Sequence, residues 1–170
     1  MHRLFVLRHA KSSWNNSSLS DHDRPLAPRG ERAAEALAAH VAAIAPPPAL
    51  VLCSTARRAQ DTLGPVRGKL PERTGVSIEA ELYGASAPEL LDRLRQVPDD
   101  VESVMLVGHN PGLEDLVKGL GRDGDPDLIA RVQRKFPTGA LATLSLSGPW
   151  KSLEWGTATL ETFVVPAELG

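Results

Sequence analysis

The sequence predicts an α/β fold in the form of a three-layer α/β/α sandwich with a mostly parallel central sheet. Short, continuously apolar runs rich in Val and Leu at residues 4–7, 50–53 and 104–107 are typical of strands buried on both faces of a parallel sheet. Segments with helical spacing lie between these runs. Strands that alternate with helices favour right-handed crossovers, which cover both faces of the sheet.

Four helices are expected in the order of the chain. The first covers residues 28–45, where apolar residues recur at helical spacing among alanines and three successive prolines then end the helix. The second covers residues 56–66. A proline begins each of the other two, at residues 88–97 and 111–120, because proline fits the first turn of a helix.

The last part of the chain has a different pattern. Residues 141–146 alternate apolar with small polar residues, and residues 153–165 are rich in Thr and Val. Both segments are expected to be strands, and one of them is a candidate for antiparallel pairing. Because we find no repeat, linker or low-complexity tract, residues 1–170 are expected to form a single domain.

Composition excludes several classes of partner. A net charge of -2 and a pI near 6.2 give no overall basic field, so neither nucleic acid nor an anionic membrane is expected as a partner. Cys53 is the single cysteine, which excludes a disulfide framework and a cysteine-based metal site. The chain start lacks a signal-like apolar region and no run approaches a membrane span, so a soluble, cytoplasmic protein is expected.

Polar side chains directly follow three of the predicted strands, and ligands of open α/β sheets bind beyond the carboxyl ends of the strands. The residues concerned are Arg8 and His9, then Ser54, Arg57 and Arg58, and finally Gly108, His109 and Asn110. The forked donors of arginine suit the oxygens of a phosphoryl group, so this edge predicts a phosphate site. Spacing alone does not choose between Arg57 and Arg58, and the remaining histidines at 2, 22 and 40 are expected at the surface.

These residues resemble the motifs of the histidine phosphatase superfamily, which includes the cofactor-dependent phosphoglycerate mutases. Four segments carry the resemblance in the family's order, from residue 4 to about 120: Arg8 to Asn15 for the Arg-His-Gly signature with its downstream Trp-Asn; Asp23, Pro25, Leu26 and Gly30 for Pro-Leu-x-x-x-Gly; Ser54, Arg58, Ala59 and Thr62 for Ser-x-x-x-Arg-Ala-x-x-Thr; and Gly108 with His109 for the late Gly-His. Ala10 stands where the family usually has Gly. The short chain and its Gly-His-Asn-Pro-Gly run are most similar to the SixA-like phosphohistidine phosphatases.

The resemblance implies a phosphoglycerate mutase-like fold and a phosphatase that needs no metal or other cofactor. His9 would be the nucleophile, since a neutral imidazole attacks well near pH 7 when its other nitrogen is held, here by an implied backbone carbonyl. Arg8, Arg58 and His109 would bind the phosphoryl oxygens and supply the positive charge that a metal provides elsewhere. Further candidate phosphate contacts are Ser12, Asn15 and Asn110.

The proton donor to the leaving group is the least defined role. Glu81 is the first candidate because, with Tyr83 and Gly84, it resembles a Glu-x-x-Tyr-Gly stretch of the mutase branch, one position out of register. An ordinary surface carboxylate is the alternative interpretation of Glu81. Asp21 and Asp23 are further options.

Other functions were weighed against this one. A cysteine phosphatase needs Cys-x₅-Arg, but the sixth residue after Cys53 is Ala59, so Cys53 is expected to be a buried apolar residue. A mutase needs a capping insertion that excludes water, for which the chain is too short. The predicted function is hydrolysis of phosphohistidine on a partner protein. A small-molecule phosphomonoesterase or mutase of the same superfamily is the first alternative, and a catalytically inactive phosphate-binding signalling module is an alternative from another class.

Overall fold

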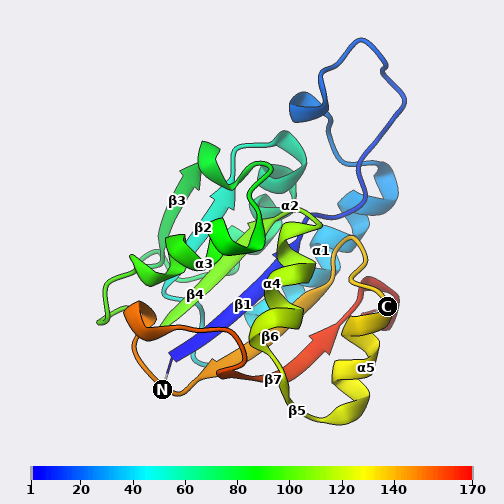
Figure 1. The fold of residues 1–170 in the computed structure, drawn as a ribbon. Coiled ribbons are helices and arrows are strands. Elements are labelled where there is room, and N and C mark those ends of the chain that lie inside the picture. Colours follow the sequence, from blue (N-terminus) through cyan, green and yellow to red (C-terminus); the bar gives the residue numbers. More distant parts are fainter. Residues whose placement is uncertain (1, 170) are drawn as a thin grey trace.

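The computed structural model describes residues 2–169, in which a seven-stranded sheet lies between two layers of helices (Figure 1). The strands are β1 (His2–Arg8), β2 (Leu50–Ser54), β3 (Gly75–Glu79), β4 (Ser103–Gly108), β5 (Asp123–Gly124), β6 (Leu141–Leu146) and β7 (Ala158–Val164). The α-helices are α1 (Pro28–Ala42), α2 (Arg57–Arg67), α3 (Ala87–Arg95), α4 (Gly112–Leu120) and α5 (Pro126–Arg134). Short 3₁₀ turns are η1 (Asp21–Asp23), η2 (Ala80–Leu82), η3 (Trp150–Ser152) and η4 (Pro166–Glu168).

The sheet has the strand order β3-β2-β4-β1-β6-β7-β5. Strands β3, β2, β4 and β1 pair in parallel, and β5 pairs in parallel with β7. Strand β6 runs antiparallel to both of its neighbours, β1 and β7. The prediction of a mostly parallel sheet with an antiparallel strand near the end of the chain is therefore confirmed.

The two faces of the sheet bury alternate residues of each strand. Phe5 and Leu7 of β1 pack in the core beneath α1 and α2, whereas Leu4 and Val6 pack in the core beneath α3, α4 and α5. Figure 1 shows these three helices in front of the sheet and α1 and α2 behind it. Cys53 is fully buried in the core on the α1 and α2 side, as expected for an apolar role.

Predicted helix boundaries differ from the observed ones by one to three residues at most ends. Helix α1 stops at Ala42 rather than at residue 45, because the residue before a proline disfavours helical backbone and Pro46 follows. Helix α3 begins within a residue of the prediction, capped by a reciprocal bond pair between Ser86 and Glu89. Within residues 2–169, no helix has the length and apolar character that crossing a membrane requires.

Candidate active site

The carboxyl ends of β1, β2 and β4 lie at one edge of the sheet because these strands are parallel and adjacent (Figure 1). This edge carries Arg8, His9 and His109, and the first turn of α2 adds Arg58. Arg58 has a side chain that is 9% exposed, whereas that of Arg57 is 55% exposed and pairs with Asp61. The structure therefore places Arg58, and not Arg57, in the cluster, which we call the carboxyl-edge site.

His9 is buried with one ring nitrogen fixed. Its Nδ1 lies 2.7 Å from the carbonyl oxygen of Ala10, and since a carbonyl can only accept, Nδ1 carries the proton and donates it there. Nε2 is left with its lone pair. Burial lowers the pKa of His9 to about 3, with smaller contributions from the charges of His109 and Arg58, so the ring is neutral at pH 7.

His109 faces His9, with 5.2 Å between the ring centroids. Its Nε2 lies 2.8 Å from Ser54 Oγ, which already accepts a bond from the Ala56 N–H at 3.1 Å. The Ser54 hydroxyl can donate its proton to Nε2, and with that tautomer Nδ1 is the N–H donor of a neutral ring. Nδ1 is buried without a partner among the described residues, and burial, followed by Arg58, lowers the pKa of His109 to about 4.

Arg8 is held by the loop between α5 and β6. Its Nη1 donates to the carbonyl oxygen of Phe136 at 3.0 Å, while Nε is buried with no partner in the described part of the chain. Asn110 donates to the same carbonyl at 2.9 Å, and its Oδ1 accepts from the Glu114 N–H at 3.2 Å. Asn110 therefore secures the start of α4 next to Arg8 and keeps one amide N–H for a ligand.

Thr62 joins the chain after His9 to helix α2. Its buried hydroxyl accepts from the Ala10 N–H at 2.9 Å and donates to the Arg58 carbonyl at 2.7 Å. Gly30 fixes the same stretch from α1, because a Cβ there would lie 2.0 Å from the Lys11 carbonyl oxygen. Both residues belong to the motifs of the sequence, and both position the backbone rather than contact a ligand.

Ser12 and Asn15, predicted as phosphate contacts, lie in the segment after His9. The hydroxyl of Ser12 is buried and accepts from Arg24, so it is turned toward that guanidinium. Asn15 is exposed, and its backbone N–H donates to Ser13 Oγ. Neither residue has a hydrogen bond to the carboxyl-edge site in the structure, so their roles stay predictions.

Glu81 does not join the carboxyl-edge site. It lies on η2, is exposed, and lines a hollow beside α3 together with Glu79, Glu89 and Arg93. Its negative charge contributes to the raised pKa of Arg93, whose main cause is the hydrogen bond to Glu79. The structure thus places Glu81 near Arg93, and its role as proton donor stays a prediction.

Asp21 contacts the carboxyl-edge site through Arg58, although from the sequence it ranked below Glu81 as a candidate proton donor. Arg58 donates from Nη1 to its backbone oxygen at 2.7 Å and from Nη2 to its Oδ2 at 3.0 Å. Asp23, two residues further, contacts Ser20 and His22 instead. Tyr83, which donates to Asp21 at 2.5 Å, was not predicted as a site residue, although its Tyr-Gly step beside Glu81 was noted.

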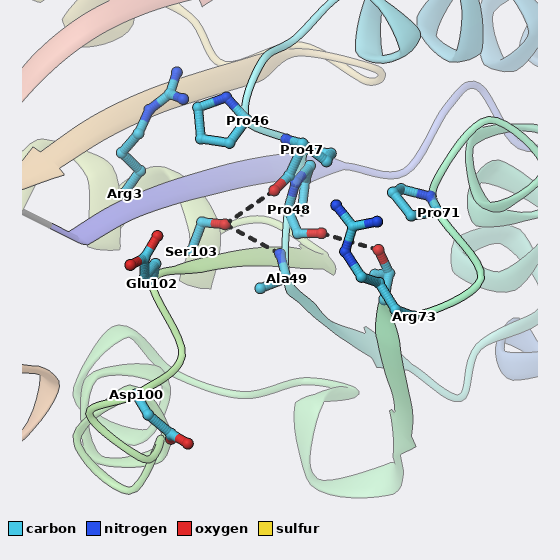
Figure 2. A pocket seen from close by; sticks show the side chains of 11 residues that line it. Arg3, Pro46, Pro47, Pro48, Ala49, Pro71, Arg73, Asp100, Glu102 and Ser103 are labelled. Carbon is cyan, nitrogen blue, oxygen red and sulfur yellow. Dashed lines mark hydrogen bonds between the residues drawn. The ribbon is translucent and has the colours of Figure 1, made fainter.

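A large hollow lies at the opposite edge of the sheet, where the parallel strands begin (Figure 2). This amino-edge cavity has a volume of about 340 Å³ and mixes positive Arg3 and Arg73 with negative Asp100 and Glu102 beside prolines 46–48. Ser103 Oγ in its wall accepts from the Ala49 N–H at 3.0 Å and donates to the Pro47 carbonyl. Within residues 2–169, no group of three or more His, Cys, Asp or Glu side chains has an arrangement that could hold a metal ion.

Comparison with known proteins agrees with the motifs. The profile of the histidine phosphatase superfamily (branch 1) matches residues 4–90. An uncharacterized protein of Mycobacterium tuberculosis strain H37Rv is 38% identical over 166 residues, which cover 94% of this chain and 99% of that protein. This chain belongs to the histidine phosphatase superfamily.

Two solved structures of this superfamily are similar over nearly their whole length. A candidate phosphohistidine phosphatase SixA from Nakamurella multipartitia has 34% identity and a TM-score of 0.84, covering 97% of this chain and 96% of the other. A candidate phosphohistidine phosphatase SixA from Agrobacterium tumefaciens has 32% identity and a TM-score of 0.79, with coverages of 97% and 98%. Within the histidine phosphatases, the chain is therefore SixA-like.

Proposed function

We propose that this chain is a metal-independent phosphatase that removes the phosphoryl group of a phosphohistidine protein through a covalent intermediate on His9, with residues 1–170 acting as one domain. The observation that carries the proposal is the state of the His9 ring. It is buried, neutral and fixed through Nδ1, with the Nε2 lone pair available beside three further cationic or N–H donor side chains.

The first step forms a bond between Nε2 of His9 and phosphorus and breaks the bond to the leaving group. Arg8, Arg58 and His109 bind the phosphoryl oxygens, whose charge is spread out in the transition state. Each donor of this kind is worth about 2.7 to 4 kcal/mol in comparable sites. When phosphohistidine is the substrate, the electron pair of the broken P–N bond stays on the leaving imidazole, which departs neutral if its other nitrogen carries a proton.

The second step is attack by water on the phosphohistidine. The P–Nε2 bond breaks, its electron pair returns to Nε2, and the proton of the water passes to the phosphate product. The proton on Nδ1 stays there throughout, in its hydrogen bond to the Ala10 carbonyl. His9 is thus restored without a change of tautomer, which suits repeated turnover.

Two further observations support the choice of substrate and of mechanism. The similar solved structures carry the name phosphohistidine phosphatase, and an imidazole leaving group has less need of a positioned acid than an alkoxide has. The two arginines supply positive charge where other phosphatases use a metal ion. A small phosphoester is the alternative substrate within the same mechanism.

Replacement of the nucleophile is the direct test of the proposal. His9→Ala should abolish turnover, and wild-type protein quenched during reaction with a labelled substrate should carry an acid-labile, base-stable phosphate on His9. His40→Ala on α1 removes the same side chain away from the site and should leave turnover intact. Label on Cys53 or on a serine would contradict the mechanism.

Removal of metal ions tests the second part of the proposal. Incubation with EDTA should leave kcat and KM unchanged, because Arg8 and Arg58 already provide the charge. The activity of the treated protein is measured before and after addition of Mg²⁺ or Zn²⁺. An increase on adding either ion would count against the mechanism.

A further inference from the structure

The proposed mechanism gives a role to Arg58 but none to the other members of the polar cluster that contains it. This cluster consists of the Asp21 carboxylate and the three side chains that donate to it, Arg24, Arg58 and Tyr83. These residues come from three separate segments, namely η1 with the residue after it, α2, and the residue after η2. Three donor side chains thus bond to one carboxylate, and we ask what this arrangement does for the site.

The carboxylate oxygens of Asp21 are held by strong donors. Oδ1 accepts from Arg24 Nη1 at 2.8 Å, and Oδ2 accepts both from Arg58 Nη2 at 3.0 Å and from the Tyr83 hydroxyl at 2.5 Å. Hydrogen bonds with an ionised partner are shorter and stronger than neutral ones. The Asp21 side chain is therefore fixed, although it is half exposed.

Arg24 ties this carboxylate to the segment that follows the nucleophile. Its Nε donates to the Ser13 carbonyl at 3.1 Å, its Nη2 donates to Ser12 Oγ, and its guanidinium lies 3.2 Å from the centre of the Trp14 ring. Arg24 is only 7% exposed. The chain after His9 and the carboxylate of Asp21 therefore hold each other in place.

Tyr83 ties the same carboxylate to the second histidine of the site. Its ring meets His109 edge-on, with 5.5 Å between centroids and 80° between the planes, while its hydroxyl bonds to Asp21. Asp21 thus has two supports: Arg24, which also bonds to the segment after His9, and Tyr83, which packs against His109. Between these supports lies the guanidinium of Arg58.

We propose that Asp21 is the positioning residue of Arg58, which it holds by two bonds so that the remaining donors of the guanidinium meet a phosphoryl group. An arginine side chain has five N–H donors, of which Asp21 takes two. The inference rests on the proposed function, since it assigns Arg58 the phosphoryl group as its ligand.

The rival interpretation makes Asp21 the proton donor to the leaving group. Its hydrogen bond from Tyr83, followed by its bond from Arg58, lowers the pKa of Asp21 to about 2, so the carboxyl group has no proton to give near neutral pH. Three donors on its oxygens also leave it arranged to accept protons rather than to release one. A fixed, negative Asp21 orients an arginine well and donates a proton poorly.

Asp21→Asn separates the two roles, because it keeps the shape and removes the charge. If Asp21 positions Arg58, kcat/KM should fall about 10- to 100-fold, the range for loss of a hydrogen bond to a charged group. The factor should be the same for nitrophenyl phosphate, an alkyl phosphate and phosphohistidine, since Arg58 serves all three. The inhibition constant of inorganic phosphate should rise as well. Loss confined to the alkyl phosphate, with phosphate binding unchanged, would overturn the inference in favour of a proton donor.

Asp61→Asn is the matched control. It makes the same change in an exposed Arg–Asp pair on the same helix, with Arg57 in place of Arg58, and an exposed pair contributes little. Activity should stay within about twofold of wild type. Tyr83→Phe provides a second variant, which keeps the ring against His109 and removes one bond to Asp21. It should shift the same constants in the same direction by a smaller factor.

The Arg58→Ala background distinguishes failure of this inference from failure of the proposed function. With Arg58 absent, Asp21→Asn should cause no further loss of kcat/KM or of phosphate binding. If Arg58→Ala itself leaves turnover unchanged, the proposed phosphate site is wrong. If Arg58→Ala impairs turnover and Asp21→Asn alone does not, only the positioning role is wrong.

Discussion

The two edges of the central sheet differ in where their polar groups are satisfied. At the amino-edge cavity the lining hydroxyl of Ser103 is bonded to backbone on both sides, and the charges of opposite sign are mixed. At the carboxyl-edge site Arg8 Nε and His109 Nδ1 are buried without partners among the described residues, within one cluster that also contains His9. The third such atom, His2 Nδ1, lies apart from them at the start of β1 and outside the lining of the amino-edge cavity. A buried donor without a partner costs free energy, so such donors in one cluster indicate a place for a ligand.

The comparison shows that hydrogen bonding, rather than volume, distinguishes these two places in the molecule. The amino-edge cavity has a volume of about 340 Å³, but its lining mixes charges of opposite sign. The carboxyl-edge site instead gathers N–H donors around His9, which fits an anion. The following predictions test this contrast between the two edges.

The largest expected effect is on catalysis after loss of an arginine from one edge but not from the other. Arg8→Ala should lower kcat about 10²- to 10³-fold, the loss typical of one donor to a developing charge. Arg73→Ala at the amino-edge cavity should change kcat less than about twofold, as for other exposed charges. Steady-state rates with nitrophenyl phosphate measure both. Equal losses would show that the amino edge also contributes to turnover.

A smaller effect is expected from removing two hydroxyls, one at each edge of the sheet, that both form hydrogen bonds to backbone groups. Thr62 and Ser103 each bridge two backbone groups and are buried. Thr62→Val should lower the free energy of unfolding by about 1 to 3 kcal/mol, because it leaves the buried Ala10 N–H unpaired. Ser103→Ala should lower it less, because the Ala49 N–H also donates to the backbone carbonyl of residue 103 at 3.1 Å. Only Thr62→Val should also lower kcat, by about tenfold, since its partner N–H belongs to Ala10, which fixes His9. Urea unfolding and kinetics on the same preparations measure the two effects.

A gradual effect, spread over several pH units, is expected from the two buried histidines. The pKa values of His9 and His109 are lowered to about 3 and about 4, so below about pH 6.5 the unfolded chain binds more protons than the folded one. The free energy of unfolding should therefore fall as the pH drops from about 6.5 toward 4, by at most about 1.4 kcal/mol per pH unit for each histidine. His9→Asn should make this slope shallower, as urea unfolding at successive pH values would reveal. An unchanged slope would mean that His9 is not held neutral.

The sequence predicted the buried strands well and the marginal elements poorly. Strands β1, β2 and β4 are continuous apolar runs because both faces are covered, and this pattern has few other interpretations. Strand β3 at the sheet edge has no fully buried residue, and α5 has Val132 as its buried residue. Neither element was predicted, because a weakly buried segment carries little periodic signal.

The carboxyl-edge site was predictable to the extent that strand ends determine it. Parallel pairing brings Arg8, His9 and His109 to one edge whatever the loops do. Residue spacing does not reveal which side of α2 faces the site, and this decides between Arg57 and Arg58. Spacing also does not reveal the 3₁₀ turn η2, which determines where Glu81 lies. Asp21 reaches Arg58 through the path of a surface loop, which is set by tertiary contacts.

The burial of Cys53 has a practical consequence for experiments on this protein. Burial raises the pKa of its thiol to about 12, so almost no reactive thiolate forms near neutral pH. Cys53 is also the single cysteine of the chain. The wild-type protein therefore behaves toward alkylating reagents as if it contained no cysteine. A thiol introduced in the exposed loop after His9, for example by Asn16→Cys, would take up a fluorophore at that one position and could report the approach of a partner protein.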